Sequence, residues 1–593
     1  MARCAAAPAH GNLRNERAKK RCDHRGSEPV AALALPAGAV LNRTWPPPLN
    51  AFRRRSPTAT PLPARRAGRG LCLLLAGALG LSGQAPLQAQ VRLPALGESA
   101  SDDFNLSQEK RVGEQIMGEI RRDPDYLDDP VLLDYLRSIW SPLVAASRQR
   151  GDIGVDTVQL FPYEVFLVRD RSVNAFALPG GYVGVHLGLI ALTATPDELA
   201  SVLAHELSHI TQRHIARSVA ASSRNSTLGL AAILLGVLAA SRASSPDAAQ
   251  AAIVGGQAAM VQGQLNFSRD MELEADRNGL VVMAGAGFAP QGMASMFDKL
   301  DQANRINDSG GYPYLRSHPL TVDRIGEARQ RVESTGGSLV AARPPLLHVL
   351  MQARARALMD PSVQSLRRLQ DLDQRGAQAE LPLADRLGAF AGAALASSRL
   401  RDFARAERAA TALGALVATL PADAEPALRR AVNQLRAELA LASGDAAGAQ
   451  RLLATDDADT TRPGLMLRAQ AALASADPQA LRGSSELLQT WVSDHRKDAS
   501  AWLLLSQSAD RLGWKLRAVR AEAESQAALG NLPGAIDRLR AGQQLARSGT
   551  VGADFIELSV IDARLRDLQS QRRQLLAEQR SASRGRQRDE PTE

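Results

Sequence analysis

The stretch Leu199–His214, LASVLAHELSHITQRH, places two histidines four residues apart inside an apolar run. The residues just before it are typical of a helix start, with Thr195 as the N-cap, Pro196 in the first turn and two acidic residues after it. Four residues correspond to about 400° of rotation in an α-helix, so His205 and His209 project from one face. The stretch therefore predicts a helix that presents two imidazoles one turn apart.

Two imidazoles in this arrangement can bind one Zn²⁺ per chain. Glu206, between them, reaches a water at the metal rather than the metal itself. It is therefore the candidate general base, taking the proton of the water and passing it to the leaving amine. This chemistry hydrolyses a peptide bond with no covalent enzyme intermediate.

A catalytic zinc needs a third protein ligand and one open position. The later segment FSRDMELEADRNG supplies a candidate. In a helix, Glu272 and Asp276 share a face, whereas Glu274 points nearly the opposite way. We predict Glu272 as the third ligand, and Asp276 as the acceptor of a hydrogen bond from a ligating imidazole. Ala275 and Gly279 on or near this face permit close packing of another helix.

The composition excludes one function class. The 593 residues carry a formal net charge of +9, with 45% apolar and 22% charged residues, so two or three folded units are expected. Residues 1–89 hold fourteen basic and three acidic residues, which leaves 57 basic and 59 acidic residues in the remainder. The excess charge belongs to the leader, and no nucleic-acid partner is indicated.

The leader has the order of a secretory signal peptide: basic ARRAGRG, apolar LCLLLAGALGLSG at residues 71–83, then small residues up to Ala89. An n-region this long is unusual, so we expect translation to start downstream of Met1. The alternatives are a genuine extension or a retained membrane anchor. All three cysteines lie in this leader, so the remainder has no thiol chemistry, as an oxidising compartment such as the periplasm permits.

Helices are expected at residues 106–122 and from Pro130 onward, and strands within 158–168 and 175–190. Two apolar arms, residues 228–240 and 251–263, indicate a helical hairpin. It either covers the site, touches a membrane surface peripherally, or is buried in the core.

Beyond Pro344 the sequence becomes rich in Ala, Leu, Arg and Gln with helical patterning. It resembles degenerate tetratricopeptide repeats, with a generic helical bundle as the alternative. The predicted fold class is α+β, a mainly helical zinc metallopeptidase domain with a small β-sheet, followed by an all-α tetratricopeptide-like domain. The expected boundaries are a leader at 1–89 (with 1–60 disordered or not translated), a linker at 90–104, the peptidase domain at 105–340, the repeat domain at 345–570 and a disordered tail at 571–593.

Four elements together resemble family forty-eight of the gluzincin metallopeptidases, which includes the CAAX prenyl protease and HtpX. They are NAFALPGG, HELSH, SRDMELEADRNG and SHPLTVDRI, in that order. The export signal and the repeat-like half are most similar to its periplasmic BepA-type branch. The resemblance implies an endopeptidase in outer-membrane protein quality control, with polypeptide substrates such as outer-membrane proteins and an assembly-machinery partner bound through the repeats.

The resemblance also implies roles for residues outside the helix motif. Asn174, Ala175 and Phe176 would border the cleft and contact substrate, unless they form an ordinary packing hairpin. His318 would approach the metal, either as a fourth ligand that suppresses activity or as a donor to a developing oxyanion. A purely structural His318 is the third reading. Arg324 is expected to pair with a carboxylate near the site.

Two function classes remain in competition. The first is the zinc endopeptidase; the second is a chaperone or scaffold that binds envelope proteins through its repeats and keeps a largely latent metal site. Glu206 favours the first, because a scaffold does not need a general base beside its metal. A structural zinc site is disfavoured, because such sites usually have four closed ligands rich in Cys.

Overall fold

The computed structural model of the chain describes residues 104–221, 269–306, 312–334, 345–421, 423–456, 459–548 and 554–588. The chain divides into two units, Met1–Ala89 and Gln90–Glu593, and every described residue belongs to the second. The expected signal segment and the apolar hairpin lie outside the described residues. Within the described ranges, no helix combines the length and the apolar composition needed to cross a bilayer.

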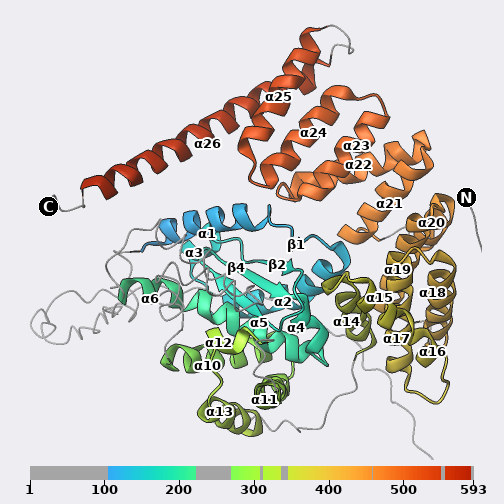
Figure 1. Cartoon of the computed structure of the whole chain (residues 1–593). Coiled ribbons are helices and arrows are strands. Elements are labelled where there is room, and N and C mark those ends of the chain that lie inside the picture. Colours follow the sequence, from blue (N-terminus) through green and yellow to red (C-terminus); the bar gives the residue numbers. More distant parts are fainter. Residues whose placement is uncertain are drawn as a thin grey trace, which may run out of the picture. The chain divides into compact units, whose positions relative to one another are not determined.

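The described part is mainly helical and contains one small sheet, which confirms the α+β class (Figure 1). Its first part consists of α1 (Leu106–Ile120), β1 (Tyr126–Leu127), α2 (Pro130–Arg150), α3 (Val155–Leu160), β2 (Glu164–Val168), β3 (Ala175–Leu178), β4 (Tyr182–His186), α4 (Leu187–Leu192), α5 (Pro196–Thr211), α6 (His214–Ala221), α10 (Arg269–Gly285), α11 (Gln291–Ile306), α12 (Tyr314–Ser317) and α13 (Val322–Ser334).

The four strands lie in the order β1-β2-β4-β3. β2 and β4 are parallel, and β3 pairs antiparallel with β4, with Ala175 opposite Val185. The turn between β3 and β4 contains Gly180 and Gly181 with φ of +78° and +88°, a conformation that glycine adopts without strain. β3 is therefore an edge strand among the described strands, and it contacts α5.

One strand expectation is wrong in its first half. Residues 158–160 belong to the helix α3, and only Glu164–Val168 forms a strand. The local reason is a turn stabilised by Thr157, whose hydroxyl donates to the carbonyl of Gly154 at 2.8 Å. Val158 is exposed, so the apolar composition at the start of this segment does not reflect pairing in a sheet.

Helix α5 begins where the sequence indicates. The Thr195 hydroxyl accepts a hydrogen bond from the amide of Glu198 at 3.3 Å, and Pro196 occupies the first turn. Every residue from Glu198 to Ile210 is buried, so the helix lies in the core. Helix α10 packs closely against it, because a Cβ on Gly279 would lie only 3.1 Å from the backbone nitrogen of His205. This close approach brings the acidic segment of α10 to the histidines of α5.

All regular elements described after Pro344 are helices. They are α14 (Leu346–Met359), α15 (Val363–Gln370), α16 (Leu372–Gly376), α17 (Leu383–Arg399), α18 (Phe403–Ala418), α19 (Pro426–Ser443), α20 (Ala446–Leu453), η2 (Ala454–Asp456), α21 (Arg462–Ser475), α22 (Pro478–Asp494), α23 (Ala499–Arg511), α24 (Lys515–Ala528), α25 (Leu532–Arg547) and α26 (Phe555–Arg588). Most consecutive helices contact each other. Several turns combine a left-handed residue with a capping Asp or Asn: Arg401–Asp402, Gly444–Asp445, Ala476–Asp477 and Gly530–Asn531.

The expected disordered tail is wrong for residues 571–588, which continue α26. The segment is rich in Arg, Gln, Leu, Ala and Glu, which are strong helix formers, and its helix extends a packed N-terminal part. Ile561, Leu565 and Leu568 of that part are buried against α24 and α25.

The core does not end at the composition change near Pro344. One hydrophobic cluster runs from α2, the sheet and α5 into α14, α17, α18 and α19. One buried and one partly buried ion pair reinforce the connection at the start of α2. Asp129 pairs with Arg354 of α14 at 2.7 Å, and the adjacent Asp128 pairs with Arg462 of α21 at 2.7 Å. The helical half is thus joined to the sheet-containing half by core packing and by charge.

Candidate metal centre

The two histidines of α5 face each other at the centre of a buried cluster. His205 Nε2 lies 2.9 Å from His209 Nε2, and both side chains are at most 3% exposed. The shared orientation follows from their spacing of one helical turn. Both Nε2 atoms therefore point at the same position.

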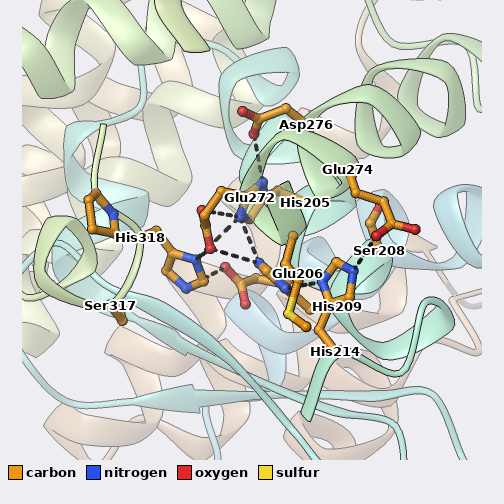
Figure 2. A network of polar contacts seen from close by, with 12 residues as sticks. His205, Glu206, Ser208, His209, His214, Glu272, Glu274, Asp276, Ser317 and His318 are labelled. Carbon is orange, nitrogen blue, oxygen red and sulfur yellow. Dashed lines mark hydrogen bonds and ion pairs between the residues drawn. The ribbon is translucent and has the colours of Figure 1, made fainter. Parts of the chain in front are cut away.

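Two further residues bring ligand atoms to this position. Glu272 of α10 has carboxylate oxygens 3.4 Å from His205 Nε2 and 3.5 Å from His209 Nε2. His318, directly after α12, places Nδ1 3.3 Å from His205 Nε2 and 3.0 Å from Glu272 Oε1. The donor atoms of these four residues all lie within 4.8 Å of one another, and Figure 2 shows their side chains pointing toward each other.

Glu206 completes the inner surface of the cluster. It is fully buried, and neither of its carboxylate oxygens has a hydrogen-bond partner in the described part of the chain. The Nε2 of His318 lies 3.5 Å from Oε1 of Glu206. A buried carboxylate without a partner is costly, so its position is explained by a ligand or water that it serves.

The outer face of His205 is fixed by Asp276 and Arg324. His205 Nδ1 lies 2.9 Å from Asp276 Oδ1. Arg324 of α13 donates to both oxygens of Asp276, from Nε at 2.6 Å and from Nη2 at 2.8 Å, and its Nη1 lies 2.9 Å from Glu272. The guanidinium thus holds the carboxylates of Glu272 and Asp276 in place, which is the pairing expected of Arg324.

The electrostatics of the cluster favour a positive charge at its centre. Burial disfavours protonation of His205, but its hydrogen bonds with Asp276 and Glu272 outweigh burial and raise its pKa to about 9. Burial, together with the His205 and His318 rings, holds the pKa of His209 well below its usual value. Burial also opposes ionisation of Glu272, yet His318 and His205 bring its pKa below the usual range. An ionised carboxylate beside imidazole nitrogens is the donor set of a divalent metal, which takes the place of the imidazole proton when it binds.

The motif spacing does not mark His214 as a site residue, yet the structure places it beside the cluster. It is fully buried, and its Nδ1 lies 2.7 Å from Nδ1 of His209. Burial lowers the pKa of His214 to about 4 despite its contact with Glu274. Helical spacing could not reveal it, because five residues along a continuous helix would turn it about 140° away from His209.

The three remaining histidines of the described residues do not join the cluster. The buried His186 lies 2.9 Å from the hydroxyl of Ser172, and the buried His348 lies 2.6 Å from the hydroxyl of Tyr135. His495 is exposed and stacks on Trp491. Their contacts indicate structural roles for His186 and His348 and a surface position for His495.

The structure does not bring Asn174, Ala175 and Phe176 into this polar cluster. Within the described residues, the hydrogen bonds and ion pairs of the four donors involve none of the three. Asn174 and Ala175 are buried, and the ring of Phe176 packs over Gly184, where a Cβ would lie 2.4 Å from it. Their connection with the site is through the contact of β3 with α5.

These features fit a divalent metal and define a metallopeptidase site, in which two histidines and an intervening glutamate lie on one helix and a further carboxylate comes from another. Residues 149–332 match the sequence model of Peptidase family M48, and the chain accordingly carries an M48 metalloprotease domain.

Individual relatives extend this comparison. A protein of Vibrio cholerae serotype O1 is 39% identical over 241 residues, which is 41% of this chain and 47% of that protein. The Beta-barrel assembly-enhancing protease of Escherichia coli (strain K12) is 29% identical over 82% of this chain and 94% of its own length. The Mitochondrial metalloendopeptidase OMA1 of Saccharomyces cerevisiae is 30% identical over 32% of this chain and 53% of that protein. The chain thus spans about half the length of the Vibrio and yeast relatives.

Proposed function

We propose that this protein is an exported, periplasmic zinc endopeptidase that hydrolyses misfolded or misassembled envelope proteins in outer-membrane protein quality control. The observation that carries the proposal is Glu206, buried without a hydrogen-bond partner in the described residues beside the converging donors of His205, His209 and Glu272. A general base must lie within reach of the proton that it removes and must not be neutralised by a permanent partner.

The mechanism assigns each residue one task. Zn²⁺ held by His205, His209 and Glu272 would supply a Lewis acid that polarises the scissile carbonyl and makes the attacking water more acidic. Glu206 takes the proton of this water on a carboxylate oxygen and delivers it to the leaving amine. Asp276 keeps the proton of His205 on Nδ1, so that the Nε2 lone pair stays directed into the cluster.

The substrate would lie along β3. This strand pairs with β4 on one side only among the described strands, and an extended peptide can add to such an edge by main-chain hydrogen bonds. Since the side chain of Ala175 is buried and Phe176 packs on the sheet, residues 174–176 would contribute mainly backbone groups and a local apolar wall. Recognition of this kind suits many unfolded sequences.

The helical half would supply the partner. The capped turns between its consecutive, contacting helices support the tetratricopeptide-like interpretation, and such arrays bind other proteins along extended surfaces. The name of the Escherichia coli relative, which this chain covers over 94% of its length, supports outer-membrane β-barrel proteins as substrates and the assembly machinery as a partner. Peripheral contact with a membrane through residues 228–263 also belongs to this proposal.

A chaperone with a largely latent metal site is the second candidate, and His318 favours it. Its Nδ1 lies as close to His205 Nε2 and Glu272 as a fourth ligand would. A fourth ligand would occupy the open position that hydrolysis needs. The same ring, turned with Nε2 toward the substrate carbonyl, would instead stabilise an oxyanion.

The deciding experiment measures degradation of an unfolded outer-membrane β-barrel protein by purified protein, beside its Glu206→Gln and His318→Ala variants. The proposal expects cleavage by the wild type and none by Glu206→Gln. Higher activity of His318→Ala identifies His318 as a restraint, and lower activity identifies it as a donor to the reaction. Zinc-loaded wild type that binds the substrate and prevents its aggregation, with no variant cleaving it, favours the chaperone. Equal cleavage by wild type and Glu206→Gln contradicts the mechanism.

A further inference from the structure

The segment that follows α5 reverses the chain so that His214 contacts the outer nitrogen of His209. α5 ends at Thr211, Arg213 has a left-handed φ of +54°, and α6 begins at His214. A non-glycine residue in this region is strained and is held there only by surrounding contacts. Arg213 has such contacts: its Nε donates to the buried Glu109 at 2.8 Å, and its Nη2 donates to the carbonyl of Phe104 at 2.8 Å.

His214 is in turn held by a residue of α10. Its Nε2 lies 3.2 Å from Oε2 of Glu274, and Arg217 of α6 donates to the same oxygen at 2.9 Å. Figure 2 shows His214 between His209 and Glu274. Glu274 points away from Glu272, as helical geometry requires. It therefore reaches His209, the second histidine of the motif, through His214.

We propose that His214 and Glu274 are positioning residues for His209, which fix its tautomer and ring orientation as Asp276 fixes those of His205. The inference rests on the proposed metallopeptidase function. If Nε2 of His209 faces the metal, its Nδ1 carries the proton and must donate it in a hydrogen bond. Nδ1 of His214 is then the acceptor, and its Nε2 carries a proton that is donated to Glu274. The assignment leaves no donor facing another donor along the chain of contacts.

Helix α10 therefore supports both histidines of α5 with carboxylates spaced two residues apart. Asp276 contacts His205 directly, whereas Glu274 contacts His209 through one intervening imidazole. Partners of this kind orient a ligand and increase its basicity, and their loss typically weakens metal binding about 10- to 100-fold. Because Glu274 is 35% exposed, we expect the larger effect from His214 itself.

The test compares zinc affinity and zinc release among variants of the full chain, measured with a chromophoric chelator, together with the melting temperature of each metal-free protein. His214→Phe keeps the ring volume and removes the acceptor, so we expect its zinc affinity to fall about 10- to 100-fold. His214→Asn can place its Oδ1 near the position of the original Nδ1, and should restore a large part of the affinity. Glu274→Met, at a partly exposed position, should weaken zinc binding less than His214→Phe.

His348→Phe is the matched control, because it removes another buried, hydrogen-bonded ring that is not near the cluster. It should lower the melting temperature and leave zinc affinity unchanged. Wild-type zinc affinity in His214→Phe, or equal loss in His214→Phe and His214→Asn, would overturn the inference. If His214→Phe does not fold, unchanged affinity in Glu274→Met overturns it. A wild-type protein that binds no zinc defeats the proposed function itself, which is a distinguishable result.

Discussion

Replacing Asp276 with Asn tests how the site depends on its outer hydrogen bonds. In the native protein, Oδ1 of Asp276 faces both Nδ1 of His205 and Nη2 of Arg324, while Oδ2 faces Nε of Arg324. An Asn side chain has one oxygen and one NH₂ group. With its oxygen in the Oδ1 position, the NH₂ group meets the Nε–H of Arg324, so that two donors face each other in a buried place.

The magnitude follows from two contributions. A buried donor without an acceptor costs about 1–3 kcal/mol, and a hydrogen bond to a charged group contributes about 1.5–3 kcal/mol. The loss of global stability is limited, because Arg324 retains its ion pair with Glu272. The part felt by His205 appears in metal binding, and loss of such a partner typically weakens binding about 10- to 100-fold. We therefore expect Asp276→Asn to lower zinc affinity by about that factor and to lower the melting temperature.

The assay is zinc competition with a chromophoric chelator at neutral pH, with circular dichroism to establish that the variant is folded. Arg277→Gln is the control, because Arg277 is the next residue on the exposed face and pairs with Glu327 at the surface. It should bind zinc as the wild type does. A folded Asp276→Asn variant with native zinc affinity would show that His205 does not depend on this carboxylate, and the argument from the hydrogen-bond network would be wrong.

Three further predictions follow from the packing around the site. Arg354→Met leaves Asp129 buried without its partner, which typically costs about 3–5 kcal/mol. Arg354 keeps the pKa of Asp129 low against the effect of burial, so the pair stabilises the native protein above about pH 4, the unfolded pKa of Asp. That contribution is lost as pH falls toward the lower pKa of the folded state. Thermal melts between pH 3 and 7 should therefore show a lower melting temperature and a weaker acid dependence in the variant, and an unchanged melt would contradict the pair's importance. Gly279→Val should push α10 away from α5 and reduce both stability and zinc affinity. In the control Gly483→Val nothing lies near the added carbon, so only the helix propensity of that position should change. Equal zinc affinity in both variants would disprove the close-packing argument. A chain truncated after Ser334 removes α14 from the core and should be insoluble or molten by near-UV circular dichroism, and a cooperative melt of this fragment would refute the shared core.

The inner part of the site could be predicted from sequence because it depends on local geometry. His205, Glu206 and His209 lie on one helix whose start is indicated by Thr195 and Pro196, and helical spacing alone places the two rings together. The choice of Glu272 over Glu274 used the same spacing on a second helix. Such reasoning needs only that both segments are helical, which the Thr195 cap indicates for the first and which the structure shows for the second.

The outer part could not be predicted in this way, because it depends on where a helix ends and in which direction the chain continues. Arg213 adopts a conformation that its residue type does not favour, and it does so through contacts with Glu109 and Phe104, more than one hundred positions earlier in the chain. No local pattern contains that information. Sequence reasoning therefore gives no role to His214 or Glu274, although His214 contacts the predicted ligand His209 and Glu274 contacts His214.

The same limit applies to the boundary between the two halves, and it has a physical consequence for the site. Composition changes near Pro344 because the later helices are Ala-rich, but a change in composition does not mark the end of a core. Helix α2 contacts α5 and α10, and the two aspartates at its start are held by arginines of α14 and α21. The helices that position the metal donors therefore rest on an element whose N-terminus is fixed by the helical half. In such an arrangement the second half contributes to the rigidity of the first, in addition to any partner that it binds.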